Sequence, residues 1–118
     1  MKKINIIKEN KDFSEILNKR KFIKNKYYTI YYNDKKEAYY RFGLSVGKKI
    51  SKKAVIRNKL KRRLKSIIDN NKNYYQKSQD YIIIMKEACL ETSYNELEKA
   101  FQDIMNKINK KGDNNETK

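Results

Sequence analysis

Apolar residues recur at helical spacing in three parts of the chain, which predicts three helices. In the first part, Phe13, Ile16 and Leu17 lie at i, i+3 and i+4 and would share one helix face. Asn10 or Asp12 can cap this short helix, which we expect to open at Asn10. The preceding residues 1–9 alternate between basic and apolar and predict an irregular arm that lies across the domain.

The other two helices are longer, and each has a clear apolar stripe. One follows a loop over residues 48–53 and ends near Asn70; its stripe consists of Ile56, Leu60, Leu64, Ile67 and Ile68. The last begins with a capping box, in which the Ser93 and Glu96 side chains satisfy first-turn amides reciprocally. Its buried face consists of Leu97, Ala100, Phe101, Ile104, Met105 and Ile108.

Three segments have strand patterns. Residues 27–33 are nearly all aromatic or β-branched, and period-two counting puts Thr29 and Tyr31 on the face opposite Tyr28 and Ile30. Residues 39–47 have the same period: Phe42, Leu44 and Val46 point one way, and Gly43, Ser45 and Gly47 leave the other face nearly bare. We expect these two segments to pair as a hairpin with one core face and one accessible face. Residues 81–85, which follow Asp80, are continuously apolar and predict a central strand buried on both faces.

These elements predict a mixed α/β (α+β) domain with the order α-β-β-α-β-α and room for one extra strand that the pattern does not place. The basic stretch at residues 19–26 is expected to be a loop. A chain of 118 residues has the length of one domain. We assign residues 1–111 to it and interpret residues 112–118 as a polar, disordered tail.

The amino-acid composition limits the classes of function that this chain can have. Lys and Arg number 30 against 14 Asp and Glu, so the formal net charge is +16, which indicates a polyanionic partner. The chain has no His and one Cys, which excludes His-based triads and cysteine-rich zinc sites. We expect no catalytic residue and no metal ligand in this chain. No apolar run approaches the roughly 18 residues of a membrane span, and the lone thiol with no export signal favours the cytoplasm.

The charge is concentrated in residues 48–65, hereafter the basic segment, which holds ten cations and no acid. A solvated helix face is the simple alternative, but such faces usually interleave Glu with Lys, because like charges at i, i+4 repel. We therefore favour a nucleic-acid surface, and we expect Arg57, at the edge of the apolar stripe, to reach past the core toward the open sheet face. The candidate RNA-binding residues are Lys48, Lys49, Lys52, Lys53, Arg57, Asn58, Lys59, Lys61, Arg62 and Lys65.

A second candidate site lies on the accessible sheet face. Phe13 and Leu17 from the first helix could wall a shallow groove whose floor includes Thr29, Tyr31 and Ser45. Aromatic floors with cationic edges hold single-stranded nucleic acid without reading its sequence. The alternative, that Phe13 and Leu17 are an ordinary core-facing pair, remains open at this point.

Residues 43–50 (Gly-Leu-Ser-Val-Gly-Lys-Lys-Ile), followed by residues 54–62 (Ala-Val-Ile-Arg-Asn-Lys-Leu-Lys-Arg), resemble the signature of the bacterial ribonuclease P protein component. The likeness extends over about residues 3–109. It implies an α/β sandwich like the second domain of ribosomal protein S5, with a left-handed βαβ crossover. It also implies a protein subunit that binds the catalytic RNA of ribonuclease P and helps to remove the 5′ leader of precursor tRNA.

By this resemblance, Arg57, Asn58, Lys59, Lys61, Arg62 and Lys65 face the catalytic RNA, and Phe13, Leu17, Thr29, Tyr31 and Ser45 form a leader-binding cleft. The RNA, with its Mg²⁺ ions, would carry out cleavage in the holoenzyme, and neither a membrane nor an obligatory protein partner is expected. Lys59 and Lys65 stand where the family favours arginine, and Leu17 replaces an aromatic residue. A structural RNA-binding protein, such as a ribosomal protein with no enzymatic assembly, is the alternative function.

Overall fold

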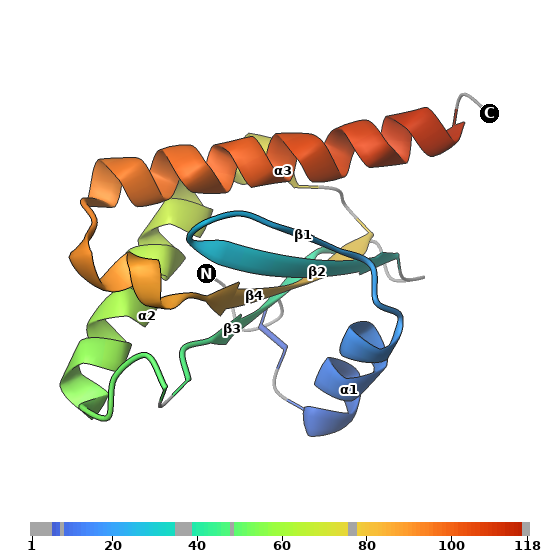
Figure 1. The fold of residues 1–118 in the computed structure, drawn as a ribbon. Helices are drawn as coiled ribbons and strands as arrows, with labels where there is room; N and C mark the ends of the chain where they lie inside the picture. Colours follow the sequence, from blue (N-terminus) through green and yellow to red (C-terminus); the bar gives the residue numbers. More distant parts are fainter. Residues whose placement is uncertain (1–5, 8, 35–38, 48, 76–77, 117–118) are drawn as a thin grey trace.

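The computed structural model describes residues 6–7, 9–34, 39–47, 49–75 and 78–116, with side chains described as far as residue 110. Figure 1 shows the elements in their spatial arrangement. In chain order they are α1 (Asn10–Asn18), β1 (Phe22–Lys24), β2 (Tyr28–Asp34), β3 (Arg41–Ser45), α2 (Ala54–Asn70), the 3₁₀ helix η2 (Lys72–Tyr74), β4 (Gln79–Met85), the 3₁₀ helix η3 (Glu87–Glu91) and α3 (Tyr94–Glu116).

The four strands form one sheet in the order β1-β2-β4-β3, in which β4 is antiparallel to β2 and parallel to β3. The expected hairpin between residues 27–33 and 39–47 is therefore wrong, because β4 lies between these strands. The apolar run in β4 explains the insertion, since only a central strand covered on both faces can bury both sets of its side chains. β3, α2 and β4 form the parallel crossover unit, whose handedness stays a prediction.

The extra strand is β1, which lies within the stretch that we expected to be a loop. It pairs antiparallel with β2 and forms one edge of the sheet. Its three residues are flanked by cations, which hid the strand pattern. The observed order is therefore α-β-β-β-α-β-α, the predicted order with the additional strand placed.

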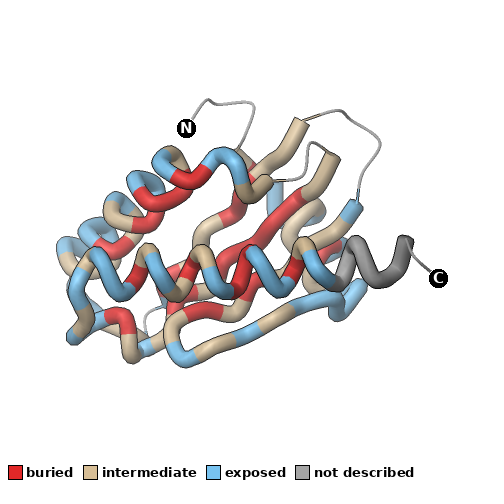
Figure 2. The backbone as a smooth tube through the Cα atoms, turned by 90° about the horizontal axis from the view of Figure 1, so that it is seen from above, coloured by how far each residue is buried: buried red, intermediate tan, exposed pale blue. Residues whose placement is uncertain are grey.

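Helices α2 and α3 pack against one face of the sheet and enclose the main core (Figure 1). The predicted stripes of both helices are confirmed: Leu60, Leu64, Ile67 and Ile68 of α2 are buried, as are Leu97, Phe101, Ile104, Met105 and Ile108 of α3. Figure 2 shows buried positions along the central strands and on the inward sides of the helices. The predicted core face of the strands is also confirmed, since Tyr28, Ile30 and Phe42 are fully buried.

Helix α1 covers part of the opposite face, so that face is less open than we expected. Ile7, Ile16 and Ile82 form a second, smaller cluster there, and Phe13, Leu17, Tyr31 and Ile84 pack against it. The N-terminal arm contributes Ile7, whose amide donates to the Phe42 carbonyl oxygen at 3.0 Å. The remaining arm residues, 1–5 and 8, lie outside the described residues.

The two predicted helix caps are only partly correct. Glu9, rather than Asn10 or Asp12, is the N-cap residue of α1, and its side chain makes no capping hydrogen bond. At α3, Ser93 Oγ accepts from the Glu96 amide at 3.2 Å as predicted. The Glu96 carboxylate instead accepts from Thr92 Oγ1 at 2.7 Å and from the Tyr27 hydroxyl at 3.2 Å. These two hydrogen bonds, the Thr92 bond first, lower the pKa of Glu96.

The backbone of α3 remains helical to Glu116, past residue 112, where we placed the start of the tail. Residues 117 and 118 of that predicted tail lie outside the described residues. None of the helices in the described part of the chain is long and apolar enough to cross a membrane.

Candidate nucleic-acid interface

The loop that leads into α2 is built from local hydrogen bonds. The Ile50 amide donates to the Gly47 carbonyl oxygen at 3.0 Å, and Ser51 Oγ accepts from the Lys53 amide at 3.2 Å. Lys53 then serves as the N-cap residue of α2. Lys49, Lys52 and Lys53 are exposed on this loop, whereas Lys48 lies outside the described residues.

Arg57 stabilises the same loop, and the expectation that it reaches toward the open sheet face is not met. Its Nη1 donates to the Ser51 carbonyl oxygen at 3.0 Å and, more weakly, to the Lys52 carbonyl oxygen at 3.5 Å. The helical spacing brings its head back over the loop that precedes α2, where two carbonyl groups accept from it. Arg57 therefore orders the loop lysines.

The outward face of α2 presents cations to solvent. Asn58, Lys59, Arg62 and Lys65 are exposed, and Lys61 is half-buried. Among the described residues, no cation of the basic segment lies within 4.0 Å of a carboxylate oxygen; the ion pairs found there all involve Arg41. The described carboxylates thus form no ion pair with the cations of α2 that would offset the repulsion between neighbouring positive charges.

The sheet register arranges the face beneath α1 into two rows. In the first row Tyr31 pairs with Ile82, which pairs with Gly43. In the second row Thr29, Ile84 and Ser45 are matched in the same way. Directly paired residues point to the same face, so each row crosses the sheet.

Helix α1 lies over the first row and leaves the second partly exposed. A Cβ built on Gly43 would lie 2.5 Å from Phe13 Cζ, so the Phe13 ring rests directly on the sheet. Thr29, Ile84 and Ser45 are each partly exposed, and we call this second row the strip. The five residues predicted for the cleft thus share one face, with Phe13 and Leu17 from α1 and Thr29, Tyr31 and Ser45 from the sheet.

Sequence reasoning missed Ile84, which lies between Thr29 and Ser45 in the strip. Period-two counting along β4 places Ile82 and Ile84 on this face, but the continuous apolar run indicated burial on both faces. Ile82 is 1% exposed, whereas Ile84 is partly exposed although it packs against the cluster of Ile7, Ile16 and Ile82.

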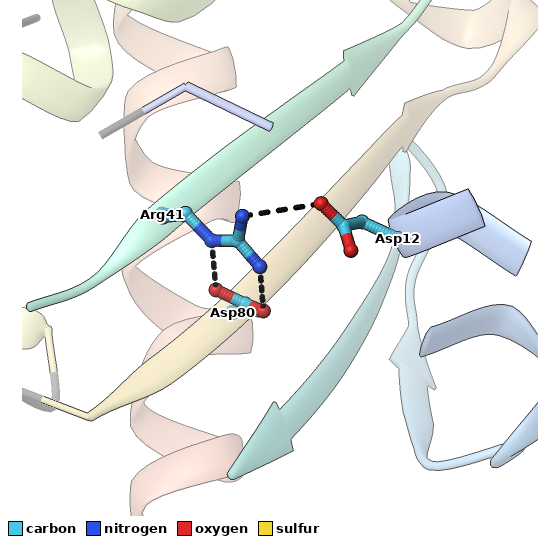
Figure 3. A network of polar contacts seen from close by, with 3 residues as sticks. All are labelled: Asp12, Arg41 and Asp80. Atoms are coloured by element: carbon cyan, nitrogen blue, oxygen red, sulfur yellow. Dashed lines mark hydrogen bonds and ion pairs between the residues drawn. The ribbon is translucent and has the colours of Figure 1, made fainter. Parts of the chain in front are cut away.

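Arg41, also missed, ties α1 to the sheet. Figure 3 shows its guanidinium between two carboxylates. Nε and Nη2 donate to Asp80 at 2.9 and 2.7 Å, and Nη1 donates to Asp12 at 3.3 Å. The Asp80 hydrogen bond is the main reason that the pKa of Arg41 is raised. Because Asp12 belongs to the first turn of α1, this network positions Phe13, the next residue, over Gly43.

Comparison with known proteins identifies the family. The family model described as Ribonuclease P matches residues 1–109. The ribonuclease P protein component of Mycoplasma capricolum is 42% identical over 109 residues, which are 92% of this chain and 99% of that protein. The chain belongs to the ribonuclease P protein family. The Bacillus cereus ribonuclease P protein component is 39% identical over 101 residues, or 85% of this chain and 87% of the relative.

Solved structures of the ribonuclease P protein family have the same fold. A mutant of the Staphylococcus aureus RNase P protein superposes with a TM-score of 0.82 at 30% identity, covering 92% of this chain and 90% of that one. The Thermotoga maritima RNase P protein superposes with a TM-score of 0.77 over 84% of this chain and 93% of that chain; at 24% identity it supports the fold alone. The chain therefore has the role of a ribonuclease P protein component in tRNA processing, and a ribosomal protein without an enzymatic assembly is not favoured.

Proposed function

We propose that the basic segment binds the RNA of ribonuclease P and that the strip, with Phe13, Leu17 and Tyr31, holds the 5′ leader of precursor tRNA. The observation that carries this proposal is the row of cations on α2 and its preceding loop, without carboxylate partners in the described part of the chain. Phosphates would relieve their mutual repulsion and release counterions on binding.

The basic segment closely follows the Ser45 end of the strip along the chain, which supports assigning the leader to the strip and the ribonuclease P RNA to the basic segment. Ser45 ends β3 and the strip, and the loop that carries Lys49, Lys52 and Lys53 begins two residues further on. A nucleic-acid strand that leaves the strip at Ser45 therefore meets cations at once. Tyr31 and Phe13 offer rings to bases, and the Thr29 and Ser45 hydroxyls can hydrogen-bond to sugar or phosphate oxygens.

We propose that the RNA, with its bound Mg²⁺ ions, performs the cleavage and that this chain contributes binding and positioning. Several carboxylates already have structural partners: Asp12 and Asp80 hold Arg41, and Glu98 accepts from Asn71 Nδ2 at 3.1 Å. In the part of the chain that the structure describes, no three acidic or cysteine side chains are grouped to hold a metal ion. The site of action that we propose is the cytoplasm, where a free thiol such as Cys89 stays reduced.

Three residues that depart from the family pattern are expected to contribute less to RNA binding than the usual residues would. Lys59 and Lys65 keep the charge but lack the forked geometry of arginine, so their phosphate contacts are less directional. Leu17 keeps an apolar contact and offers no ring. Tyr31 and Phe13 therefore supply the stacking that we propose for the leader.

Reconstitution tests the assembly. Ribonuclease P RNA and precursor tRNA are incubated at low Mg²⁺ with and without the protein, and leader removal is followed over time. We expect the protein to stimulate cleavage that the RNA performs slowly alone, and the protein without RNA to be inactive. Cleavage by protein alone, or no stimulation, would contradict the proposal.

Tyr31→Ala tests the leader site within the assembled enzyme. We expect the apparent Kd for precursor tRNA to rise about fivefold or more, as for loss of one stacked base, and the Kd for mature tRNA to stay unchanged. Tyr32→Ala is the matched control, because Tyr32 is the neighbouring tyrosine and packs against the main core instead. Equal losses for both tRNAs would place Tyr31 in a purely structural role.

A further inference from the structure

Strand β1 carries an exposed aromatic side chain next to the proposed leader site. Phe22 is 39% exposed, one of the few large apolar side chains in the described residues that reach such exposure. Its ring lies 5.1 Å from the Tyr31 ring, centroid to centroid, with the two planes tilted by 40°. The two rings therefore form one continuous aromatic surface.

The register of β1 extends both rows of the sheet by one residue. Phe22 pairs with Tyr31 at the end of the first row, and Lys24 pairs with Thr29 at the end of the strip. Ile23, which lies between them in the strand, packs against the main core on the other face. Phe22 and Lys24 thus face the α1 side together with Thr29 and Tyr31.

The segment around β1 is as basic as the start of α2. Residues 19–26 contain five cations and no acid, and all five are exposed: Lys19, Arg20, Lys21, Lys24 and Lys26. No described carboxylate lies within ion-pair distance of them. Arg20 has a φ of 55°, a conformation that favours glycine, so the chain keeps a cation where the backbone prefers no side chain.

We propose that β1 extends the leader site, with Phe22 stacking on a leader base and Lys24 contacting a leader phosphate. This inference rests on the proposed function. The exposed ring suits a base, and the surrounding cations suit a single-stranded nucleic acid. They disfavour a second copy of this chain, because two segments with this charge would repel each other.

The position of β1 identifies which leader nucleotides it contacts. β1 and β3 are opposite edges of the sheet, separated by three strand spacings of about 4.8 Å, or roughly 14 Å. The basic segment follows the carboxyl end of β3, which is the edge strand opposite β1. At about 3.4 Å per stacked nucleotide, β1 lies up to about four nucleotides along the leader from the Ser45 end. β1 therefore contacts the leader nucleotides furthest from the basic segment, and only a leader long enough to reach that edge engages it.

The test is a leader-length series in the reconstituted holoenzyme. The Kd is measured for precursor tRNAs with leaders of about two and about ten nucleotides, and for mature tRNA. We expect Phe22→Ala to weaken binding of the long-leader substrate by roughly fivefold or more and to leave the other two unchanged. Phe22→Tyr should bind the long-leader substrate as the native chain does, because tyrosine keeps the aromatic ring. Leu90→Ala, which removes another exposed apolar side chain, is the matched control.

Lys24→Ala provides an independent measurement that removes no packing. We expect it to lower the salt slope of log K by about 0.7 for the long leader only, as for loss of one single-strand phosphate contact. Lys99→Ala, an exposed lysine of α3, removes the same charge elsewhere.

The outcomes separate this inference from the proposed function. A Phe22→Ala loss that is equal for short and long leaders would overturn the inference, because Phe22 would then only support Tyr31. No loss from Phe22→Ala or Lys24→Ala, while Tyr31→Ala keeps its precursor-specific loss, would overturn the inference alone. No precursor-specific loss from any of the three would overturn the leader site as well.

Discussion

At Gly43 the missing side chain lets the Phe13 ring lie against the sheet, since a Cβ there would lie 2.5 Å from Phe13 Cζ. We expect Gly43→Ala to push Phe13 away and to lower the free energy of unfolding by about 1–3 kcal/mol, as for an overpacked site. Urea denaturation measures this change. Gly47→Ala is the matched control, because the nearest heavy atom to its added Cβ is 3.9 Å away. Additive costs for Gly43→Ala and Phe13→Ala would contradict the contact, since removing the ring should relieve the overlap.

The buried Cys89 thiol makes the free energy of unfolding depend on pH in the alkaline range. The thiol is fully buried and its Sγ donates to the Tyr27 carbonyl oxygen at 3.1 Å. Burial raises the pKa of Cys89 from 9.0 to about 11. Since the folded state keeps the proton and the unfolded state loses it first, this contribution is complete below pH 9 and is lost as the pH rises through about 11.

We therefore expect the free energy of unfolding to decrease between about pH 9 and 10 in the native sequence, and to decrease less in Cys89→Ala. Denaturant melts at several pH values measure both slopes. Above that range the buried tyrosines Tyr28 and Tyr75, whose pKa values burial also raises, add a further decrease in both proteins. Identical slopes in the two proteins below pH 10 would show that the thiol is not protected.

At the scale of elements, the attachment of α1 to the sheet depends on Arg41. The Asp80 side chain is 4% exposed, so removing the Arg41 guanidinium leaves a buried carboxylate without the positive charge that it pairs with. We expect Arg41→Ala to cost about 3 kcal/mol of unfolding free energy and to impair precursor binding by releasing Phe13. Asp12→Asn removes only the more exposed partner and should cost less than about 1 kcal/mol. Similar costs for the two variants, measured by urea denaturation, would contradict this ranking.

The exposed cations of α2 predict how RNA binding depends on salt concentration. Arg62 and Lys65 are exposed, and neither forms an ion pair within the described part of the chain, so replacing both with Ala should leave stability nearly unchanged. For RNA binding, we expect the salt slope of log K to fall by about 0.7–0.9 for each lost phosphate contact. Filter binding at several salt concentrations measures the slope. Lys99→Ala with Lys107→Ala, two exposed lysines of α3, is the control, and an equal change there would indicate a non-specific charge effect.

Elements whose signal lies in neighbouring residues could be predicted from the sequence, and long-range pairings could not. The stripe of α2 and the alternation around Thr29 and Tyr31 are local periodicities, and both are confirmed. The apolar run of β4 predicted a central strand, which is confirmed. Which strands flank β4 depends on pairing between distant segments, which no local pattern encodes. Arg41 was missed for the same reason, because its partners Asp12 and Asp80 are far away in sequence. Phe22 was missed because a three-residue strand among cations has no detectable period.

At the scale of the whole molecule, the net charge of +16 opposes folding through self-repulsion. Added salt screens this repulsion over a Debye length that falls from about 20 Å to below about 10 Å between roughly 20 and 200 mM. We expect the Tm to rise over this range in NaCl, with sulfate raising it further because it binds cations and is excluded from apolar surface. A Tm that falls with NaCl would indicate that attractive surface ion pairs dominate instead.

The insertion of β4 between β2 and β3 has a consequence for how the protein is made. A nascent chain that has not yet reached Gln79 already contains the whole basic segment, but it has no strand to join β2 to β3. Such a chain is a polycation without a completed sheet, and neither Tyr31 nor Ser45 has its partner in β4. Under the proposed function, attraction to RNA therefore arises on the ribosome before any discrimination between precursor and mature tRNA, and that discrimination begins only when the last third of the chain has been synthesised and folded.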